Sequence, residues 1–144
     1  MGLILQRGQT VFADTVTFIY YFENHEVYAD RLDRLFQSFA DLNVQIVTSM
    51  VTYIEVLTLP EKNGNHRLAA KYRDYLTNSE NLSVYPLDFQ VADEAVRLRA
   101  KHGLRTPDAI QLATARVCGA DVVLTNDQRW RIVPNMPVVL MDEV

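Results

Sequence analysis

The sequence contains a single cysteine, Cys118, so it can form no internal disulfide and no zinc site built on paired cysteines. It also lacks a glycine-rich phosphate-binding loop, which excludes the common nucleotide-binding motifs. Near the start of the chain, residues 3–5 form an apolar run too short for the core of a signal peptide or for a membrane span. These absences favour a protein of the reducing cytoplasm, with no membrane segment and no organic cofactor.

Positive charge is also scarce, because 14 basic residues face 18 acidic ones and the net charge is −4 at pH 7. A protein whose whole surface binds nucleic acid by charge is usually basic, so that mode is disfavoured, while a local basic patch stays open. The 49% of hydrophobic residues is typical of a soluble globular chain. A length of 144 residues predicts one domain over residues 1–144, in which residues 1–9 are expected to form a flexible N-terminal extension.

Short apolar runs alternate with amphipathic segments along the chain, a pattern typical of strands that alternate with helices. The expected strands cover residues 10–13, 44–48, 82–87, 121–125 and 138–141. The expected helices cover residues 15–22, 28–42, 49–59, 68–78, 88–103 and 106–118, the third stopping before Pro60. Capping residues are expected at Thr15, Ser49, Asp88 and Thr106. This alternation predicts an α/β fold, a parallel sheet with helices on both faces.

Acidic residues recur where the strands end, which is where such sheets bind ligands. Asp14 follows the first strand, Asp127 follows the fourth, and Glu55 and Asp108 lie in the first turns of two helices. We expect all four side chains to project from one edge of the sheet. Asp14 lies between apolar residues and is expected to be half-buried. Glu55 lies in an almost wholly apolar helix, where an unpaired carboxylate would be costly.

Each acid also has an ordinary structural interpretation. An acid in the first turn of a helix commonly complements the helix dipole, which taken alone favours that role for Asp108. Asp127 alone would be an ordinary turn residue. The joint pattern instead favours a shared purpose, because two carboxylates ~5 Å apart repel by about 3 kcal/mol at an effective dielectric near 20. Such acids hold either protons or a cation, and oxygen ligands without Cys or His suit Mg²⁺ or Mn²⁺.

The segments that carry these acids resemble the motifs of PIN-domain proteins, most closely the VapC-type toxin ribonucleases. The segments are Ala13-Asp14-Thr15, Thr52-Tyr53-Ile54-Glu55-Val56, Leu104-Arg105-Thr106-Pro107-Asp108-Ala109 with Leu112-Ala113-Thr114-Ala115, and Thr125-Asn126-Asp127. The resemblance runs from about Thr10 to Met141; the motifs are specific together and weak singly. The chain departs from the family in a longer, more polar start. Trp130, Arg131 and the turn at residues 134–137 lie where such proteins vary most.

The resemblance implies a three-layer α/β/α, Rossmann-like domain whose five mostly parallel strands run in the order 3-2-1-4-5. It also implies an endoribonuclease dependent on Mg²⁺ or Mn²⁺, frequent homodimers and a small antitoxin protein that blocks the site. By position, Asp14, Glu55, Asp108 and Asp127 match the four acids of the family, and Thr125 matches its small hydroxyl residue near the metal. Thr15 and Asn126, in the same motifs, are supporting candidates.

Arginines flank the expected site. Arg105, Arg129 and Arg131 match phosphate geometry and are candidates for holding RNA, with solvated surface arginine as the alternative. Arg97, Arg99 and Lys101 lie on one helix and would extend a track of phosphate contacts, although a solvated helix face is the simpler interpretation.

The sequence thus predicts a metal-dependent endoribonuclease that hydrolyses RNA phosphodiester bonds, behaving as the toxin of a toxin–antitoxin pair. Asp14, Asp108 and Asp127 would hold the metal, and Glu55 would be a further ligand or orient the attacking water. No Ser or Cys is positioned for a covalent intermediate. The alternative is a binding module, in which the same acids hold a metal structurally or accept an arginine of a partner protein without turnover.

Overall fold

The computed structural model describes residues 3–144, so Met1 and Gly2, the first residues of the expected N-terminal extension, lie outside it. The chain folds into elements in the order β1 (Thr10–Ala13), α1 (Thr15–Phe22), α2 (Ala29–Asp41), β2 (Gln45–Ser49), α3 (Met50–Lys62), α4 (His66–Asn78), β3 (Leu82–Tyr85), α5 (Phe89–His102), α6 (Thr106–Val117), β4 (Val122–Thr125), the 3₁₀ helix η1 (Gln128–Ile132), β5 (Val138–Leu140) and η2 (Met141–Glu143). Each expected strand and helix is present, with ends that move by a few residues.

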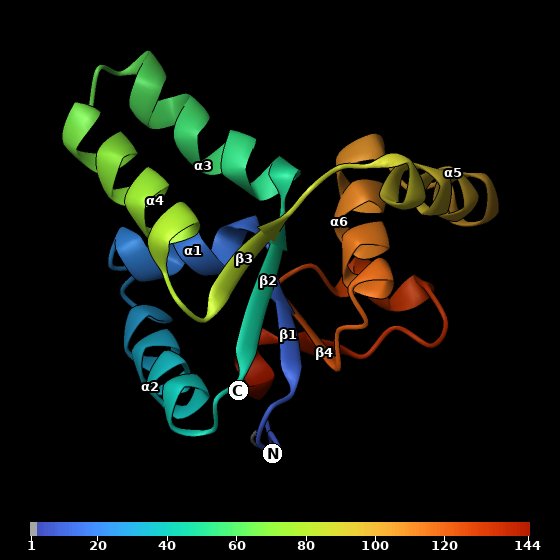
Figure 1. Ribbon diagram of the computed structural model, residues 1–144, viewed down its shortest axis with the longest axis horizontal. Helices are drawn as coiled ribbons and strands as arrows, with labels where there is room; N and C mark the ends of the chain where they lie inside the picture. Colours follow the sequence, from blue (N-terminus) through green and yellow to red (C-terminus); the bar gives the residue numbers. More distant parts are fainter. Residues whose placement is uncertain (1–2) are drawn as a thin grey trace.

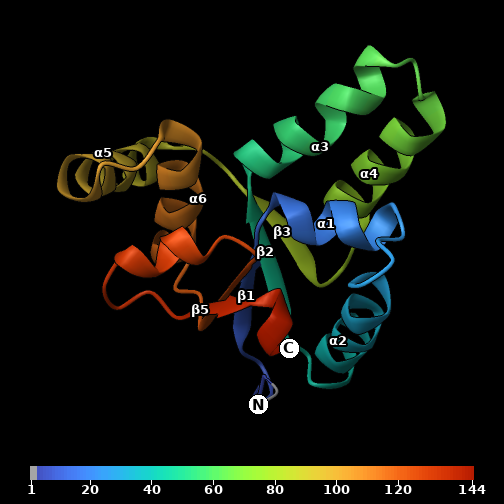
Figure 2. The ribbon, with the colours of Figure 1, turned by 180° about the vertical axis from the view of Figure 1, so that it is seen from behind.

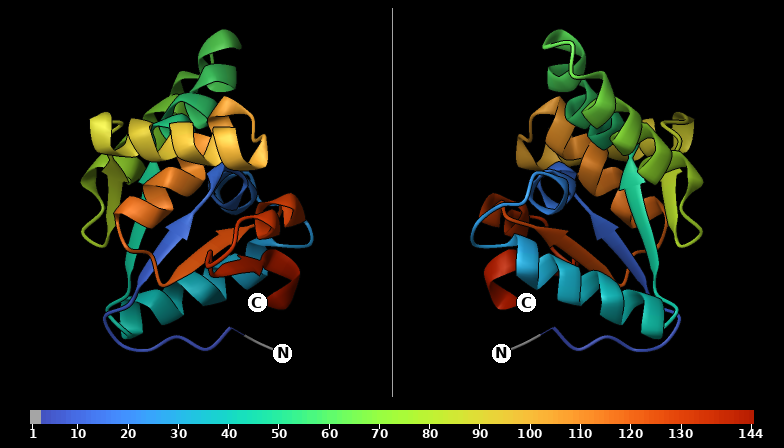
Figure 3. Two further views of the ribbon diagram at one scale, coloured as in Figure 1. Left: turned by 90° about the vertical axis from the view of Figure 1, so that its right-hand side faces the viewer. Right: turned by 90° about the vertical axis from the view of Figure 1, so that its left-hand side faces the viewer.

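The five strands form one sheet in the order β3-β2-β1-β4-β5, and every pairing is parallel. This confirms the predicted α/β class and the predicted strand order. β1 lies at the centre, with Val11 paired to Ile46 of β2 and to Val122 of β4. All five strands therefore end at the same edge of the sheet (Figure 3).

Helices cover both faces of the sheet, which gives the predicted three layers (Figures 1 and 2). α1 to α4 lie on one side of the sheet, and α5 and α6 lie on the other. Successive residues of each central strand belong to opposite cores, because side chains alternate across a strand. In β1, Val11 and Ala13 pack in the core beneath α1 to α4, whereas Phe12 packs in the core beneath α5 and α6.

Short polar side chains cap three of the helices at the strand ends. Ser49 accepts hydrogen bonds from the N–H groups of the first turn of α3, and Asp88 caps α5, as expected. At α1 the cap is Asp14, which accepts from the N–H of Thr17, and the prediction of Thr15 as the cap is wrong by one residue. Asp14 takes this role because its extended backbone (φ −80°, ψ 178°) begins the helix.

Two predicted helix ends differ from the structure near proline. α3 continues through Pro60 to Lys62, because Pro60 is buried and the carbonyl oxygens of Leu59 and Pro60 still accept from the N–H groups of Asn63 and Asn65. The cap of α6 is Arg105 instead of Thr106. This shift is tolerated because Pro107, which has no N–H, still lies in the first turn, where backbone N–H groups lack intrahelical partners.

Residues 3–9 lie against the body of the domain. Leu3 and Leu5 pack against the core beneath α1 to α4, and the N–H of Gly8 donates to the carbonyl oxygen of Leu42 at 3.0 Å. Across residues 3–144, no helix combines the length and the apolar character that crossing a membrane requires.

Candidate active site

A cavity of about 490 Å³ opens at the edge of the sheet where the strands end. Its walls come from the segments after β1 and β4, from α3, and from the first turns of α6. The lining residues are Asp14, Thr15, Val16, Glu55, Arg105, Pro107, Asp108, Gln111, Asn126, Asp127, Gln128, Arg129 and Trp130. The four acids singled out in the sequence therefore face one cavity.

Asp14 is the most buried of these acids, with 6% of its surface exposed. One carboxylate oxygen accepts from the hydroxyl and the N–H of Thr17, at 3.2 and 3.4 Å, and the other accepts from the hydroxyl of Thr125. Burial raises the pKa of the Asp14 carboxyl to about 6, because the hydrogen bonds from Thr125 and Thr17 offset only part of the desolvation. A proton or a cation would relieve that cost.

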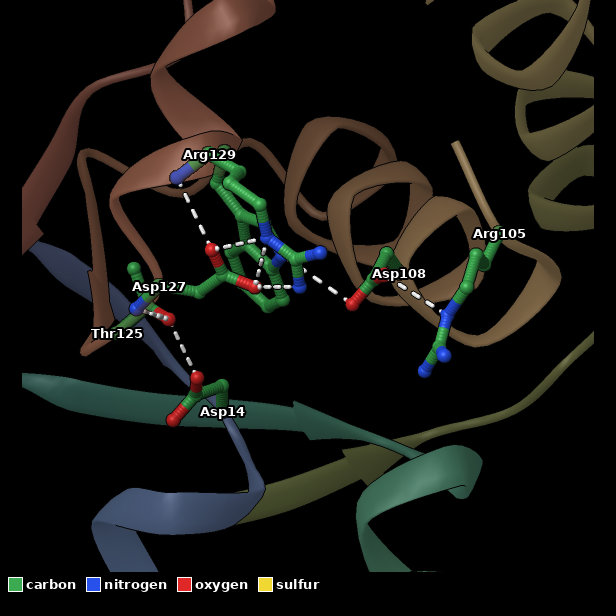
Figure 4. Close-up of polar contacts among 7 residues, drawn as sticks. Asp14, Arg105, Asp108, Thr125, Asp127 and Arg129 are labelled. Carbon is green, nitrogen blue, oxygen red and sulfur yellow. Dashed lines mark hydrogen bonds and ion pairs between the residues drawn. The ribbon is translucent and has the colours of Figure 1, made fainter. Parts of the chain in front are cut away.

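Thr125 connects Asp14 to the next acid. Its buried hydroxyl donates to Asp14 and accepts from the backbone N–H of Asp127 at 3.0 Å. The Asp127 carboxylate in turn accepts from both Nε and Nη2 of Arg129, at 2.9 and 2.6 Å (Figure 4). Hydrogen bonds from Arg129 lower the pKa of Asp127, so this carboxylate is ionised and forms an ion pair with the Arg129 guanidinium.

Asp108 lies in the first turn of α6, on the other side of the Arg129 guanidinium from Asp127 (Figure 4). One oxygen of Asp108 accepts from the indole N–H of Trp130 at 3.3 Å, and the other lies 3.8 Å from Nε of Arg105. Cationic and neutral donors of the chain thus surround two of the four acids.

Glu55 differs from its prediction, because its side chain is exposed at the mouth of the cavity and not buried in an apolar helix. The α3 surface around it is open to solvent, as the 60% exposed Ile54 shows. Its carboxylate accepts from the hydroxyl of Thr15 at 2.6 Å. The expected desolvation cost of Glu55 is therefore absent.

Gln111 joins the cavity through a network that the sequence analysis missed. The residue is 3% exposed, and its side-chain amide donates to the hydroxyls of Thr15 and Thr52, each at 3.1 Å, and accepts from the hydroxyl of Ser49. Because Thr15 also donates to Glu55, Gln111 fixes the hydroxyl that orients this acid. The available signal was a glutamine three residues after Asp108, between the apolar residues of an alanine-rich helix.

The other candidates separate into those at the cavity and those outside it. Thr15, Asn126, Arg105 and Arg129 line the cavity, and Thr125 lies buried behind Asp14. Arg131 is outside the lining and pairs with Glu143. Trp130, regarded only as part of a variable region, contributes its indole to the wall.

The donor set suits a hard divalent cation, because four carboxylates and no His or Cys line the cavity. Within residues 3–144, however, no three such side chains are gathered as in a formed metal site. Arg129 forms an ion pair with Asp127. Arg105 forms an ion pair with Asp108, and the indole N–H of Trp130 donates a hydrogen bond to it. A cation would therefore have to draw Asp127 away from Arg129.

Known protein families and solved structures include relatives of this chain. The family model described as PIN domain matches residues 11–135, and a search of curated proteins gives no match. The chain is similar to a structure of VapBC2 from Rickettsia felis bound to a DNA fragment from its promoter, with a TM-score of 0.77, 16% identity, and coverage of 92% of this chain and 98% of that one.

Two further structures are similar over most of their length. DNA-bound VapBC from Salmonella typhimurium has a TM-score of 0.74 and 21% identity, over 92% of this chain and 98% of that one. VapC20 from Mycobacterium tuberculosis, described as a sarcin-ricin loop cleaving toxin, has a TM-score of 0.69 and 19% identity, over 85% and 93%. At these identities the three structures establish a shared fold.

Proposed function

The chain belongs to the PIN-domain family, and from that premise we propose that it is a divalent-metal-dependent endoribonuclease that acts as the toxin of a toxin–antitoxin pair. One observation carries the proposal: Asp14, Glu55, Asp108 and Asp127 come from four separate segments and line one cavity at the edge where the parallel strands end. The similar structures include one described as a sarcin-ricin loop cleaving toxin, which supports RNA as the substrate class.

In this proposal Asp14, Asp108 and Asp127 hold Mg²⁺ or Mn²⁺, and Glu55 is a further ligand or orients the attacking water. The bound ion would polarise the phosphodiester, lower the pKa of water and stabilise the leaving oxygen. Thr125 places Asp14 and the backbone of Asp127 at fixed positions, since its hydroxyl contacts both.

The remaining polar side chains of the cavity serve the substrate. The Arg105 and Arg129 side chains are largely exposed, and guanidinium groups match the geometry of phosphate. Arg129, which pairs with Asp127 in this structure, would be free to contact the scissile phosphate if Asp127 held a cation instead. Thr15 and Gln111 hold Glu55 toward the cavity, which keeps its carboxylate in reach of a water molecule beside the phosphate.

The proposed regulation follows from the similar structures, of which one is described as a toxin-antitoxin complex and another as a member of the VapBC family of toxin-antitoxin systems. We propose that an antitoxin protein inserts an arginine into this cavity, where the carboxylates offer a bidentate partner. A partner arginine would replace Arg129 on Asp127 or pair with Asp14 and Asp108. We further propose a homodimer as the assembled toxin.

Purified protein tests the nuclease proposal directly. With Mg²⁺ or Mn²⁺ it is expected to cleave single-stranded RNA, EDTA is expected to stop cleavage, and Asp14→Asn is expected to lose at least about a hundredfold in rate, as removal of one key electrostatic group does in other enzymes. Asp30→Asn, an exposed acid in the first turn of α2, is the matched control and should cleave like the wild type. A wild type that binds Mn²⁺ in calorimetry and cleaves no RNA would support the binding module instead.

A further inference from the structure

A second cavity, of about 340 Å³, lies between the C-terminal half of α5, the end of α6 and the turn after η1. Its walls are rich in basic side chains, although the chain as a whole carries a net charge of −4. The lining residues are Glu94, Arg97, Leu98, Lys101, His102, Arg116, Pro134 and Asn135. We call this hollow the α5–α6 basic cavity.

Glu94 holds two arginines in fixed positions at this cavity. Its carboxylate accepts from Nε of Arg97 at 3.0 Å and from Nη1 of Arg116 at 2.9 Å, and the Glu94 side chain is only 14% exposed. Arg116 also donates to the carbonyl oxygen of Pro134 at 3.1 Å. One partly buried acid therefore orients two guanidinium groups, whose N–H donors not used by Glu94 or Pro134 are left for an anion.

Lys101 adds a charge that the chain does not neutralise. Among residues 3–144, no carboxylate lies within ion-pair distance of Lys101, which lines the cavity with an exposed side chain. Arg99, a neighbour on the same helix, turns instead to the carbonyl oxygen of Leu104, with its Nε at 3.0 Å. The predicted basic face of α5 is thus divided. Arg97 and Lys101 line the cavity, whereas Arg99 donates to a carbonyl oxygen just beyond the C-terminus of the helix.

A third hollow, of about 270 Å³, has lining residues in common with both the basic cavity and the acidic one. It shares His102 with the basic cavity, and it shares Arg105, Asp108 and Arg129 among others with the acidic one. Leu104 and Ile132, the latter 59% exposed, form an apolar part of the wall of this third hollow, which Arg105 and Arg129 also line. Alternating apolar and cationic surface suits the bases and the phosphates of an unpaired strand.

We propose that the α5–α6 basic cavity binds backbone phosphates of a single-stranded RNA whose scissile bond lies in the acidic cavity, with the strand following the hollow past His102 and Ile132. This inference rests on the proposed nuclease function for the identity of the strand. A phosphate polymer fits better than an acidic protein segment, because guanidinium donors, an unpaired ammonium and an apolar wall follow one another along a single path that ends at the candidate active site.

The test uses the full chain and the variant Arg97→Ala/Lys101→Ala, with Lys62→Ala/Arg67→Ala as control. The control removes the same charge from the exposed α3–α4 turn, on the other side of the sheet (Figure 1). Binding of a fluorescent RNA of about 15 nucleotides is measured in EDTA over a range of salt concentrations, so that it does not depend on cleavage. Loss of two phosphate contacts is expected to reduce the slope of log K against log salt by about 1.4.

Cleavage forms the second arm. With metal, the variant is expected to lose about tenfold in kcat/KM on the long RNA and to cleave a substrate of about three nucleotides at the wild-type rate, since such a substrate cannot reach both cavities. A variant whose salt slope and long-RNA cleavage equal those of the control overturns the inference and leaves the nuclease proposal intact. A poly-glutamate peptide that competes as strongly as RNA of equal charge also overturns it, in favour of an acidic protein partner.

The two proposals fail separately. If neither the wild type nor the control cleaves RNA but the salt slope falls in Arg97→Ala/Lys101→Ala alone, the phosphate site stands and the nuclease proposal fails. If the wild type cleaves RNA of both lengths with equal kcat/KM, the basic cavity does not contribute and the inference fails.

Discussion

Burial sets Asp14 apart from the other three acids of the cavity. The sequence analysis expected mutual repulsion shared among clustered carboxylates, whereas the structure places Asp127 on Arg129 and Asp108 near Arg105. The electrostatic cost therefore falls on Asp14, whose pKa burial raises from 3.8 to about 6. A shift of about two units corresponds to roughly 3 kcal/mol, which folding without a cation would have to supply at neutral pH.

This cost predicts how stability changes with pH. In the metal-free protein the folded state keeps a proton on Asp14 up to pH about 6, while the unfolded chain releases it near 3.8. The folded state therefore binds more protons between these values, and the contribution of Asp14 to the free energy of unfolding falls as pH rises through that range. The Asp14→Asn variant does not lose stability as pH rises through this range, because the asparagine side chain carries no charge. Its amide oxygen still accepts the hydrogen bonds from Thr17.

We expect Asp14→Asn to gain stability over the wild type in EDTA, by up to about 3 kcal/mol at pH 7.5 and much less at pH 4. Urea denaturation at the two pH values measures the difference. Asp30→Asn, exposed on α2, controls for removal of a charge and should show no such change with pH. A variant less stable than the wild type at both pH values would contradict the desolvation argument.

Arg129 is expected to compete with metal for Asp127. The guanidinium lies on the Asp127 carboxylate, but its side chain is 72% exposed, so solvent screens the pair and a cation can displace the arginine at little cost. Arg129→Gln should therefore bind Mn²⁺ about two- to fivefold more tightly in calorimetry, while kcat/KM for RNA falls because a phosphate contact is lost. Arg131→Gln removes an arginine that pairs with Glu143 outside the cavity, and it should change neither value.

At the scale of elements, α6 delivers both Asp108 and Gln111 to the cavity, one turn apart. Gln111 satisfies the hydroxyls of Ser49 and Thr52, which are fully buried where β2 gives way to α3. The glutamine thus fixes α6 against α3, and through Thr15 it fixes the carboxylate of Glu55.

Gln111→Leu is expected to lower the free energy of unfolding by about 2–3 kcal/mol, because the buried Ser49 hydroxyl loses its acceptor and the buried Thr52 hydroxyl loses a donor. If Gln111 acts on the reaction by positioning Glu55, Gln111→Leu lowers kcat when it is introduced into the wild-type protein. Introduced into the Glu55→Gln variant, it then lowers kcat no further. The same loss of kcat in both backgrounds would show a purely structural role. Melting curves of all variants confirm that each remains folded during the assay.

The elements of this chain were largely predictable, because local signals mark them. Asp88 and Gly103 bound α5 as their residue types suggest, and Gly103 has a φ of 67°, which glycine adopts without strain. The caps of α1 and α6 lie one residue from their predicted places, and the continuation of α3 through Pro60 comes from packing, which no local signal carries.

The candidate site was predictable only in part. The four acids follow from their places after strands and at helix starts, since parallel topology brings those places together. The Gln111 network was not predictable, because it joins residues 49, 52 and 111 through hydrogen bonds that exist only in the folded chain. The pairing of Arg129 with Asp127 depends on side-chain rotamers, and the exposure of Glu55 depends on where α3 leaves the sheet.

At the scale of the whole molecule, the fold separates charge that the composition hides. The net charge of −4 does not reveal that acidic side chains line a cavity at the strand ends while mostly basic ones line a cavity between α5 and α6. A third hollow has lining residues in common with each of the two cavities. A mildly acidic protein can therefore offer cationic surface to a polyanion where the path to the acids begins.

Metal binding should be visible in the stability of the entire domain. A ligand that binds only the folded state stabilises it, by about 2.7 kcal/mol at a hundred times its Kd, and for a domain of this size that raises Tm by roughly 5–10 °C. We expect Mn²⁺ to produce such a rise in the wild type and in Asp30→Asn, and a much smaller one in Asp14→Asn. Scanning calorimetry in EDTA and in Mn²⁺ measures it.

The same rise should disappear as pH falls below about 6, because the proton that Asp14 then holds competes with the cation. Asp108→Asn distinguishes metal binding from the interaction of an acid with the helix dipole. Loss of a first-turn carboxylate costs roughly 0.3–1 kcal/mol of stability with or without metal. Asp30→Asn, in the first turn of α2, measures that dipole cost alone. If Asp108 holds the cation, Asp108→Asn loses most of the Mn²⁺-dependent rise while Asp30→Asn keeps it. A wild-type Tm indifferent to Mn²⁺ at pH about 7.5 would mean that the four acids hold no cation, whatever the protein does with RNA.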